Sequence, residues 1–158
     1  MAVHTGQTYH SEEVSIGLPD WGLLRDAPKA ADVAGSVVHW STCALEHPDV
    51  YYFLIYLEEK PVGQILLHDQ NCQTGESLIG YHLFEPQYRG RGIGTKALAL
   101  LQQFVLKETN VSKLVIITGR DNIASQAIAK KCGFKNVGGA WEDPVNLVVF
   151  EWLAPRSE

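Results

Sequence analysis

The segment Arg89 to Gly94 contains the residue types that could bind a charged ligand. Its three glycines alternate with Arg91 and Ile93, and both arginines add positive charge. Glycine lets the backbone approach a ligand closely and adopt a positive φ without a side-chain clash. The segment follows a predicted strand and precedes an amphipathic helix, so its free N–H groups would gather at the positive end of that helix. These features predict a site for a phosphate or pyrophosphate.

Two common nucleotide motifs do not fit this segment. The dinucleotide fingerprint G-x-G-x-x-G needs glycine at position 95, where the sequence has Thr95. The mononucleotide P-loop ends in Gly-Lys-Ser/Thr, whereas Gly94 is followed by threonine and then lysine. The pattern that remains is R-x-x-G-x-G, filled by Arg89, Gly92 and Gly94.

This pattern resembles the pyrophosphate-binding motif Q/R-x-x-G-x-G/A of the GCN5-related N-acetyltransferase (GNAT) superfamily, and all six positions match. A second block resembles the family's N-x-x-S/A followed by K-x-G-F, and it consists of Asn122, Ser125, Lys131, Gly133 and Phe134. The resemblance covers about residues 50–152 and is closest to the ribosomal-protein (RimJ/RimL-like) branch. It implies one acetyltransferase domain over residues 1–158, which transfers an acetyl group from acetyl-CoA. The acceptor would be a primary amine of a small molecule or peptide, attacking directly in a ternary complex.

The same resemblance assigns the cofactor contacts. The backbones of three residues at the end of a strand should hold the pantetheine arm, namely His82, Leu83 and Phe84. The pyrophosphate should lie on the loop and the start of the next helix, at Arg89, Gly90, Arg91, Gly92, Ile93, Gly94 and Thr95. From the second block, Asn122, Ser125 and Lys131 should also reach the cofactor.

The proton-transfer residues are less clearly indicated. The attacking amine must lose a proton to a general base or a chain of waters. Glu76 and His82 are the two candidate bases, because strand alternation places them on one face. The family often protonates the departing thiolate with a tyrosine, but Ala129 occupies that position. A non-catalytic module that senses acyl-CoA is therefore the alternative hypothesis.

Trp40, Trp141 and the acidic stretch 46–49 predict an aromatic and acidic rim suited to a protonated amine. The net charge of −5 is unevenly spread, because residues 85–135 carry +6 while 1–84 carry −8 and 136–158 carry −3. A protein that binds extended nucleic acid would be basic overall, so a local anion site is favoured.

Several further expectations concern the whole chain. Three widely spaced cysteines predict reduced thiols in a cytoplasmic protein, and no residue spacing suggests a metal site. No apolar run approaches the roughly 20 residues that would span a membrane. The N-terminus has no secretory pattern. The resemblance makes a homodimer plausible, although no segment specifies an interface.

The predicted elements form an α/β (α+β) fold with a mixed, mostly antiparallel sheet and helices on both faces. Residues 1–20 read as an irregular extension and 22–25 as a short first strand. Helices are predicted at 28–45, 94–107 and 122–132, with Ala124, Ala127 and Ile128 of the last one facing inward. Further strands are predicted at 51–57, 62–67, 76–84, 113–118 and 147–152.

Overall fold

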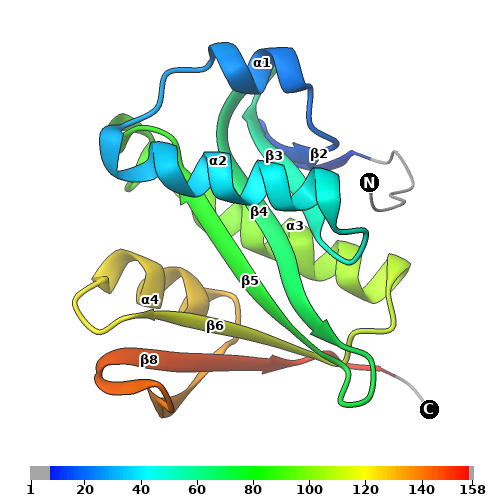
Figure 1. Ribbon diagram of the computed structural model, residues 1–158, viewed down its shortest axis with the longest axis vertical. Helices are drawn as coiled ribbons and strands as arrows, with labels where there is room; N and C mark the ends of the chain where they lie inside the picture. The colour runs from blue at the N-terminus through cyan, green and yellow to red at the C-terminus, as the bar shows by residue number, and fades with distance from the viewer. Residues whose placement is uncertain (1–7, 157–158) are drawn as a thin grey trace.

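An eight-stranded sheet runs through the protein in the computed structural model, which describes residues 8–156 (Figure 1). The strands are β1 Tyr9–Ser11, β2 Val14–Gly17, β3 Tyr51–Leu57, β4 Lys60–Asn71, β5 Glu76–Leu83, β6 Lys113–Gly119, β7 Lys135–Ala140 and β8 Asp143–Leu153. Their order is β1-β2-β3-β4-β5-β6-β8-β7. Within this sheet the β5–β6 pair is parallel and the other neighbouring pairs are antiparallel.

Helices cover both faces of the sheet. They are α1 Trp21–Asp26, α2 Ala31–Glu46, α3 Ile93–Glu108 and α4 Ile123–Lys131, with a short 3-10 turn at Pro86–Tyr88. α1 and α2 pack with Tyr52, Leu54 and Leu66 on one face. α3 packs with Phe53 and Ile65 on the opposite face, and Ala129 of α4 belongs to the same cluster. Figure 1 shows α2 in front of β4 and β5 and α3 behind them. The predicted mixed sheet with helices on both faces is confirmed.

Strand alternation explains why the two layers are separate. Residues Tyr52 and Leu54 point to one side of β3, while Phe53 and Ile55 point to the other, and all four are at most 1% exposed. The predicted strand at 51–57, helix at 94–107 and strand at 113–118 correspond closely to β3, α3 and β6, whereas β4 and β8 extend beyond their predicted limits. None of the helices within residues 8–156 is long and apolar enough to cross a bilayer.

The prediction of an irregular extension over residues 1–20 is wrong for its described part. β1 and β2 form an antiparallel hairpin, and β2 continues the sheet beside β3. Val14 and Ile16 are fully buried, so tertiary packing stabilises a segment whose alternation is too short to stand out in the sequence. Residues 1–7 lie outside the described part of the chain.

The predicted short strand at 22–25 is also wrong, because these residues form helix α1. Asp20 caps that helix, and its Oδ1 accepts a hydrogen bond from the Leu23 N–H at 3.0 Å. Of the two leucines, Leu24 is buried and Leu23 is largely exposed, which suits a helix with one apolar side.

Candidate functional site

The glycine-rich loop ends in an open helix N-terminus. Gly90 and Gly92 have φ values of 72° and 78°, in the left-handed region that favours glycine. Gly92 is the N-cap of α3 and makes no side-chain capping bond; the first intrahelical bond recorded runs from the Lys96 N–H to its carbonyl at 3.0 Å. The N–H groups of the first turn, from Ile93 to Thr95, therefore have no carbonyl partner within the helix. This arrangement is suited to bind an anion, as the sequence predicts.

A cleft of about 720 Å³ leads away from this loop. It runs between β5 and β6, passes α4, and reaches the first turn of α2. Residues that line it include Asp32, 79–83, Arg89, Gly90, Gly92–Thr95, 116–118, Asp121, Asn122, Ser125, Ile128 and Lys131. The structure thus brings the loop and the second sequence block, which are about 30 residues apart in the chain, to one continuous cavity.

The cleft exists because β5 and β6 separate. Their pairing covers three positions, Glu76–Leu78 against Lys113–Val115, and ends there. Beyond that point, residues 79–83 and 116–118 line the cleft. The Phe84 N–H bonds to β4, and hydrogen bonding alternates along an antiparallel strand, so the main-chain groups of Tyr81 and Leu83 are directed toward the gap. The gap therefore has free backbone donors and acceptors along one wall.

Phe84 lies outside the cleft, and its main-chain groups bond to other parts of the protein. Its N–H donates to the Val62 carbonyl and its carbonyl accepts from the Ala30 N–H, both at 2.8 Å. Its side chain is fully buried in the layer between the sheet and α1–α2, and the residue does not line the cleft. Of the three strand residues predicted to hold the pantetheine arm, His82 and Leu83 reach the cavity.

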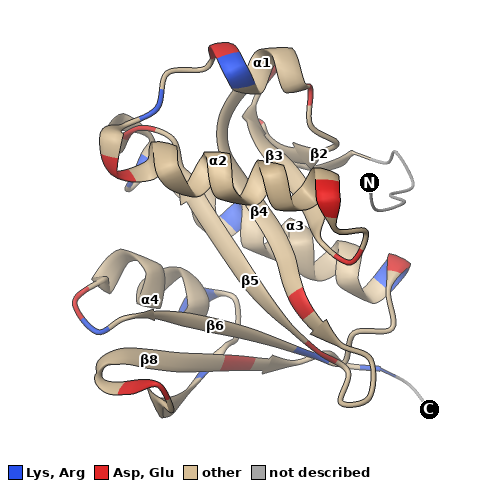
Figure 2. Ribbon diagram, in the orientation of Figure 1, with Lys and Arg blue, Asp and Glu red and all other residues tan. Residues whose placement is uncertain are grey.

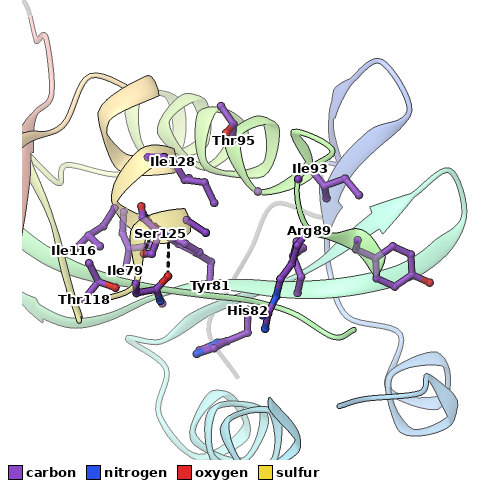
Figure 3. A pocket seen from close by; sticks show the side chains of 18 of the residues that line it. Ile79, Tyr81, His82, Arg89, Ile93, Thr95, Ile116, Thr118, Ser125 and Ile128 are labelled. Atoms are coloured by element: carbon purple, nitrogen blue, oxygen red, sulfur yellow. Dashed lines mark hydrogen bonds between the residues drawn. The ribbon is translucent and has the colours of Figure 1, made fainter. Parts of the chain in front are cut away.

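A pair of hydroxyls lies where α4 meets β5. The Tyr81 hydroxyl is 2.8 Å from Ser125 Oγ and donates to the Ser125 carbonyl at 3.1 Å (Figure 3). Asn122 fixes the helix start, because its Oδ1 accepts from the Ser125 N–H at 3.1 Å. Burial raises the pKa of Tyr81 to about 12, so this hydroxyl stays protonated at neutral pH. Tyr81 is not among the residues predicted from the sequence, although its position next to His82 on an alternating strand could have indicated it.

His82 points to the opposite side of β5 from Tyr81, and Arg89 lies on that same side (Figure 3). Nδ1 of His82 is 3.0 Å from Nε2 of Gln64, a buried residue of the neighbouring strand β4. Burial lowers the pKa of His82, so the imidazole is neutral at pH 7. Of the two candidate bases, this is the one that the structure brings to the cleft.

Glu76 lies at the far end of β5, outside the cleft. Its carboxylate is 3.9 Å from the ammonium group of Lys113, which also approaches Glu151 at 3.5 Å. It lines a separate cavity of about 360 Å³. His82 is six positions after Glu76 in an extended strand, a span of about 20 Å. Glu76 and His82 therefore share a face of β5 but line different cavities.

The charged residues of the loop have acidic neighbours. Arg89 lies 3.9 Å from Asp32, at the start of α2, and both line the cleft. Lys96 lies 3.4 Å from Glu12 and 3.6 Å from Glu13, in the turn between β1 and β2. Arg91 is exposed and, unlike the other residues of the predicted loop, is not among those that line the cleft.

One face of α4 forms a wall of the cleft, and of the three residues predicted to face inward, Ala124, Ala127 and Ile128, only Ile128 also packs against the described core cluster. These three line the cavity, and Ala124 is exposed. The buried residues of α4 are Ser125 and Ala129. The small side chains of Ala124 and Ala127 therefore leave room for a ligand where the sequence pattern indicates packing.

The predicted aromatic and acidic rim is not gathered at the cleft. Trp141 is 88% exposed at the turn between β7 and β8, and Trp40 packs against His68 with ring centroids 4.2 Å apart. Neither tryptophan is among the described residues that line the cavity. Figure 2 shows acidic residues at the end of α2 and in the loop that follows it, as well as in the β7–β8 turn. Residues 8–156 hold no group of three or more His, Cys, Asp or Glu side chains placed to bind a metal.

Comparison with protein families identifies this architecture. The family model described as an acetyltransferase (GNAT) domain matches residues 10–135. The chain belongs to the GNAT family. The match includes the glycine loop, the whole of β5 and all of α4, so every residue that lines the cleft, from Asp32 to Lys131, lies within the family domain.

Similar proteins agree with this GNAT assignment. An uncharacterised N-acetyltransferase of Bacillus subtilis (strain 168), YnaD, is 25% identical over 84 residues. That match spans 47% of this chain and 49% of YnaD, so about half of each protein is compared.

Three solved structures share the GNAT fold over most of their length. RimL, a ribosomal L7/L12 α-N-protein acetyltransferase in complex with coenzyme A, has a TM-score of 0.74 at 18% identity, covering 93% of this chain and 98% of that one. The ribosomal-protein-S5-alanine acetyltransferase of Vibrio fischeri has a TM-score of 0.73 at 14% identity, with coverages of 96% and 99%. The microcin C7 self-immunity acetyltransferase MccE, in complex with acetyl-CoA and AMP, has a TM-score of 0.67 at 17% identity, with coverages of 90% and 93%.

The residues of this GNAT cleft fit a long ligand with a phosphate end. The open N-terminus of α3 offers N–H groups to a phosphate, and apart from the adjacent residues no atom of residues 8–156 lies within 4 Å of where a Cβ would stand on Gly90 or Gly92. The gap between β5 and β6 offers backbone groups to an amide-containing arm. Ala129, where the family often has tyrosine, is fully buried, so a side chain from that position would have to enter packed core.

Proposed function

We propose that this protein is an acetyl-CoA-dependent N-acetyltransferase, in which a primary amine attacks the thioester directly in a ternary complex. The observation that supports this most strongly is the continuous cleft that joins the open N-terminus of α3 to His82 through the gap between β5 and β6. Acetyl-CoA is the substrate that such a cleft suits, because it combines a pyrophosphate, an amide-rich arm and a thioester. It supplies the acetyl group that is transferred.

The loop and helix start are proposed to hold the phosphates. The N–H groups of Ile93, Gly94 and Thr95 would donate to phosphate oxygens, and Arg89 and Arg91 would add charge. Arg89 is half-exposed and only 3.9 Å from Asp32, so it can turn from that carboxylate to a phosphate at small cost.

The gap is proposed to hold the pantetheine arm. The main-chain groups of Tyr81 and Leu83 would bond to its amides in the manner of an added strand, and Asn122 and Lys131 lie along the same cavity. An N–H from this edge would also polarise the thioester carbonyl, in the manner of an oxyanion hole. Alignment of the amine with this carbonyl would supply most of the rate acceleration.

Tyr81 and Ser125 are proposed to assist the departing sulfur. When the Tyr81 proton turns from the Ser125 carbonyl to Ser125 Oγ, the serine proton becomes free to point into the cleft and bond to the thiolate. This pair would replace the tyrosine that the family often has at the position of Ala129. The amine must be neutral to attack, and its proton can pass to water at the open mouth of the cleft.

The acceptor is proposed to be the N-terminal amine of a peptide or protein. Support comes from two structural neighbours, which are by name acetyltransferases of ribosomal proteins. A small-molecule amine is the second candidate, because MccE is a self-immunity acetyltransferase solved with AMP.

Calorimetry followed by a thiol-release assay tests this function. We expect acetyl-CoA to bind in the micromolar range, and S-acetylpantetheine, which lacks the pyrophosphate, to bind at least tenfold more weakly because the loop contacts are lost. Absence of acetyl-CoA binding at millimolar concentration would contradict the proposal. With a panel of peptides and small amines, binding without any thiol release would favour the acyl-CoA sensor.

A further inference from the structure

Three polar side chains form a chain across neighbouring strands and end at the cleft. The Tyr52 hydroxyl, on β3, donates to Gln64 Oε1, on β4, at 2.6 Å. Gln64 Nε2 lies 3.0 Å from Nδ1 of His82, on β5. Tyr52 is 1% exposed and Gln64 is fully buried, while His82 lines the cleft. Buried polar groups at this depth need partners, so each link of the chain constrains the next.

The direction of this chain follows from the phenol at its buried end. Burial raises the pKa of Tyr52, so its hydroxyl keeps its proton and must donate it. Within residues 8–156, Gln64 Oε1 is the acceptor recorded for that hydroxyl. An amide that turns its oxygen toward Tyr52 must turn its NH₂ group toward His82, so Nδ1 of the imidazole accepts a hydrogen bond.

We infer that Tyr52 and Gln64 are positioning residues that hold His82 as the neutral tautomer with its proton on Nε2, so that His82 offers a hydrogen-bond donor to the cleft and not a base. A neutral imidazole carries one proton, and the nitrogen that accepts from Gln64 cannot carry it. The remaining N–H would bind an oxygen of a ligand in the cleft. The proton of the attacking amine would then leave to water.

The charges around the ring do not oppose this state. Asp32 on α2 and Arg89 in the loop are the charged residues that line the same side of the cleft, and they lie 3.9 Å from each other. The low pKa of His82 arises from burial. Burial disfavours the imidazolium form, so the ring is neutral near pH 7 and its tautomer is what the hydrogen bonds select.

The tautomer can be read directly from ¹⁵N–¹H spectra of the histidine rings in the full-length protein without ligand, with the His82 signals assigned by comparison with His82→Gln. We expect the Nε2–H pattern in the wild type. Tyr52→Phe frees the Gln64 amide to rotate, so the Nδ1–H form should become populated. Gln64→Glu replaces the NH₂ donor by a carboxylate oxygen, so the proton should move to Nδ1.

A matched control is Tyr56→Phe, on the same strand. It removes a hydroxyl that donates to the Leu18 carbonyl at 3.1 Å and has no part in the chain, so the His82 pattern should not change. An Nδ1–H pattern in the wild type, or an unchanged pattern in Tyr52→Phe, would overturn the inference. Tyr52→Phe keeps the test available if the buried carboxylate of Gln64→Glu prevents folding.

Kinetics of His82→Gln and His82→Leu test the donor role, and this part rests on the proposed function. A glutamine amide can donate a hydrogen bond but cannot act as a base. We expect kcat/KM of His82→Gln to fall by less than about tenfold, with His82→Leu about tenfold lower still. If both variants lose about 100-fold or more, and the wild-type pH profile has a limb that disappears in both, His82 is the base and the inference is wrong.

The two tests separate this inference from the proposed function. If no amine is acetylated by the wild type, the proposed function fails. The spectra of the unliganded protein still show whether Tyr52 and Gln64 select the tautomer of His82.

Discussion

Adjacent residues of β5 present different chemistry to the two sides of the sheet. Tyr81 points toward α4 and shares a hydrogen bond with Ser125, whereas His82 points toward the side of α2 and bonds to Gln64. Under the proposed function, the acyl donor and the acceptor amine would meet at one short segment of backbone, and different side chains would contact each of them.

Ser125→Ala tests the pair of hydroxyls on the α4 side. We expect kcat to fall by about 10- to 100-fold, because a donor to the leaving sulfur acts mainly in the transition state, while KM for acetyl-CoA changes little. Steady-state thiol release at saturating amine measures both constants. Ser41→Ala is the control, because that serine also lies in a helix, where its Oγ bonds to the Val37 carbonyl at 2.6 Å. An unchanged kcat in Ser125→Ala would remove this serine from the reaction.

His82 should also make the stability of the protein depend on pH. Burial lowers its pKa in the folded state below the ordinary value of 6.5, so below pH 6.5 the unfolded chain binds a proton that the folded chain does not. The stability contributed by the neutral ring is fully present above pH 6.5. It is lost as the pH falls from 6.5 through the lower pKa that His82 has in the folded protein. The slope from one such group is at most about 1.4 kcal/mol per pH unit.

Urea unfolding at pH 7.0 and 5.5 measures this effect. We expect the wild type to lose more free energy of unfolding between these pH values than His82→Gln does. His10→Gln, which replaces an exposed histidine, should behave as the wild type. If the wild type and His82→Gln lose equal free energy of unfolding, His82 takes up its proton as readily in the folded protein as in the unfolded chain.

At the scale of elements, the loop before α3 is held open by glycines that adopt positive φ. An L-residue in the left-handed region costs roughly 1–2 kcal/mol. Gly92→Ala should therefore destabilise the folded loop or shift it to another conformation, even though no atom within 4 Å would meet the new methyl group.

The expected result for Gly92→Ala is an acetyl-CoA affinity at least fivefold weaker by calorimetry, with the fold retained in circular dichroism spectra. Gly35→Ala is the matched control, because Gly35 lies within α2 and also has open space around it. That change should stabilise the protein by roughly 0.5–1 kcal/mol and leave affinity unchanged. Equal affinities for the two variants would mean that the loop geometry does not depend on Gly92.

Elements that rest on local signals could be predicted from the sequence. The loop and α3 are contiguous, so Arg89 to Thr95 indicate both the turn and the helix that follows it. The N-terminal hairpin could not be predicted in the same way, because β2 has four residues and its stability depends on burial beside β3. α1 was missed because Asp20, which caps it, precedes only six helical residues.

The side-chain contacts of the site join residues that are far apart in the sequence, and no local sequence pattern indicates such contacts. Tyr81 and Ser125 are 44 residues apart, and their contact requires α4 to lie across β5. The chain from Tyr52 through Gln64 to His82 depends on the registers of β3, β4 and β5. Strand alternation alone also predicts Glu76 and His82 as two candidate bases of one site. They share a face of β5 but lie at opposite ends of the strand.

At the scale of the whole molecule, Arg156 bonds the segment after β8 to the C-terminal end of α3. The Arg156 guanidinium donates to main-chain carbonyls around the C-terminus of that helix, including those of Val105 at 2.9 Å, Thr109 at 2.8 Å and Val111 at 3.0 Å. A cation is favourable at this end of a helix, and the fork of donors bonds to carbonyls both in the last turn and beyond it.

Arg156→Met should lower the free energy of unfolding by about 1–3 kcal/mol, measured by urea titration. Arg25→Met is the control, because Arg25 is exposed and pairs with the adjacent Asp26, an interaction worth about 0–1 kcal/mol. If the two variants are equally stable, the C-terminal contact does not contribute to folding.

The short pairing of β5 with β6 divides the sheet into two parts, β1 to β5 and β6 to β8. Three residue pairs join these parts directly, and beyond them the strand edges face each other across the cleft. A ligand that bonds to the β5 edge while contacting Ile116 and α4 would join the two parts where β5 and β6 do not pair. Amide hydrogen exchange should therefore slow on both strands when acetyl-CoA binds, including positions that do not contact it, because the occupied cleft opposes relative motion of the two parts.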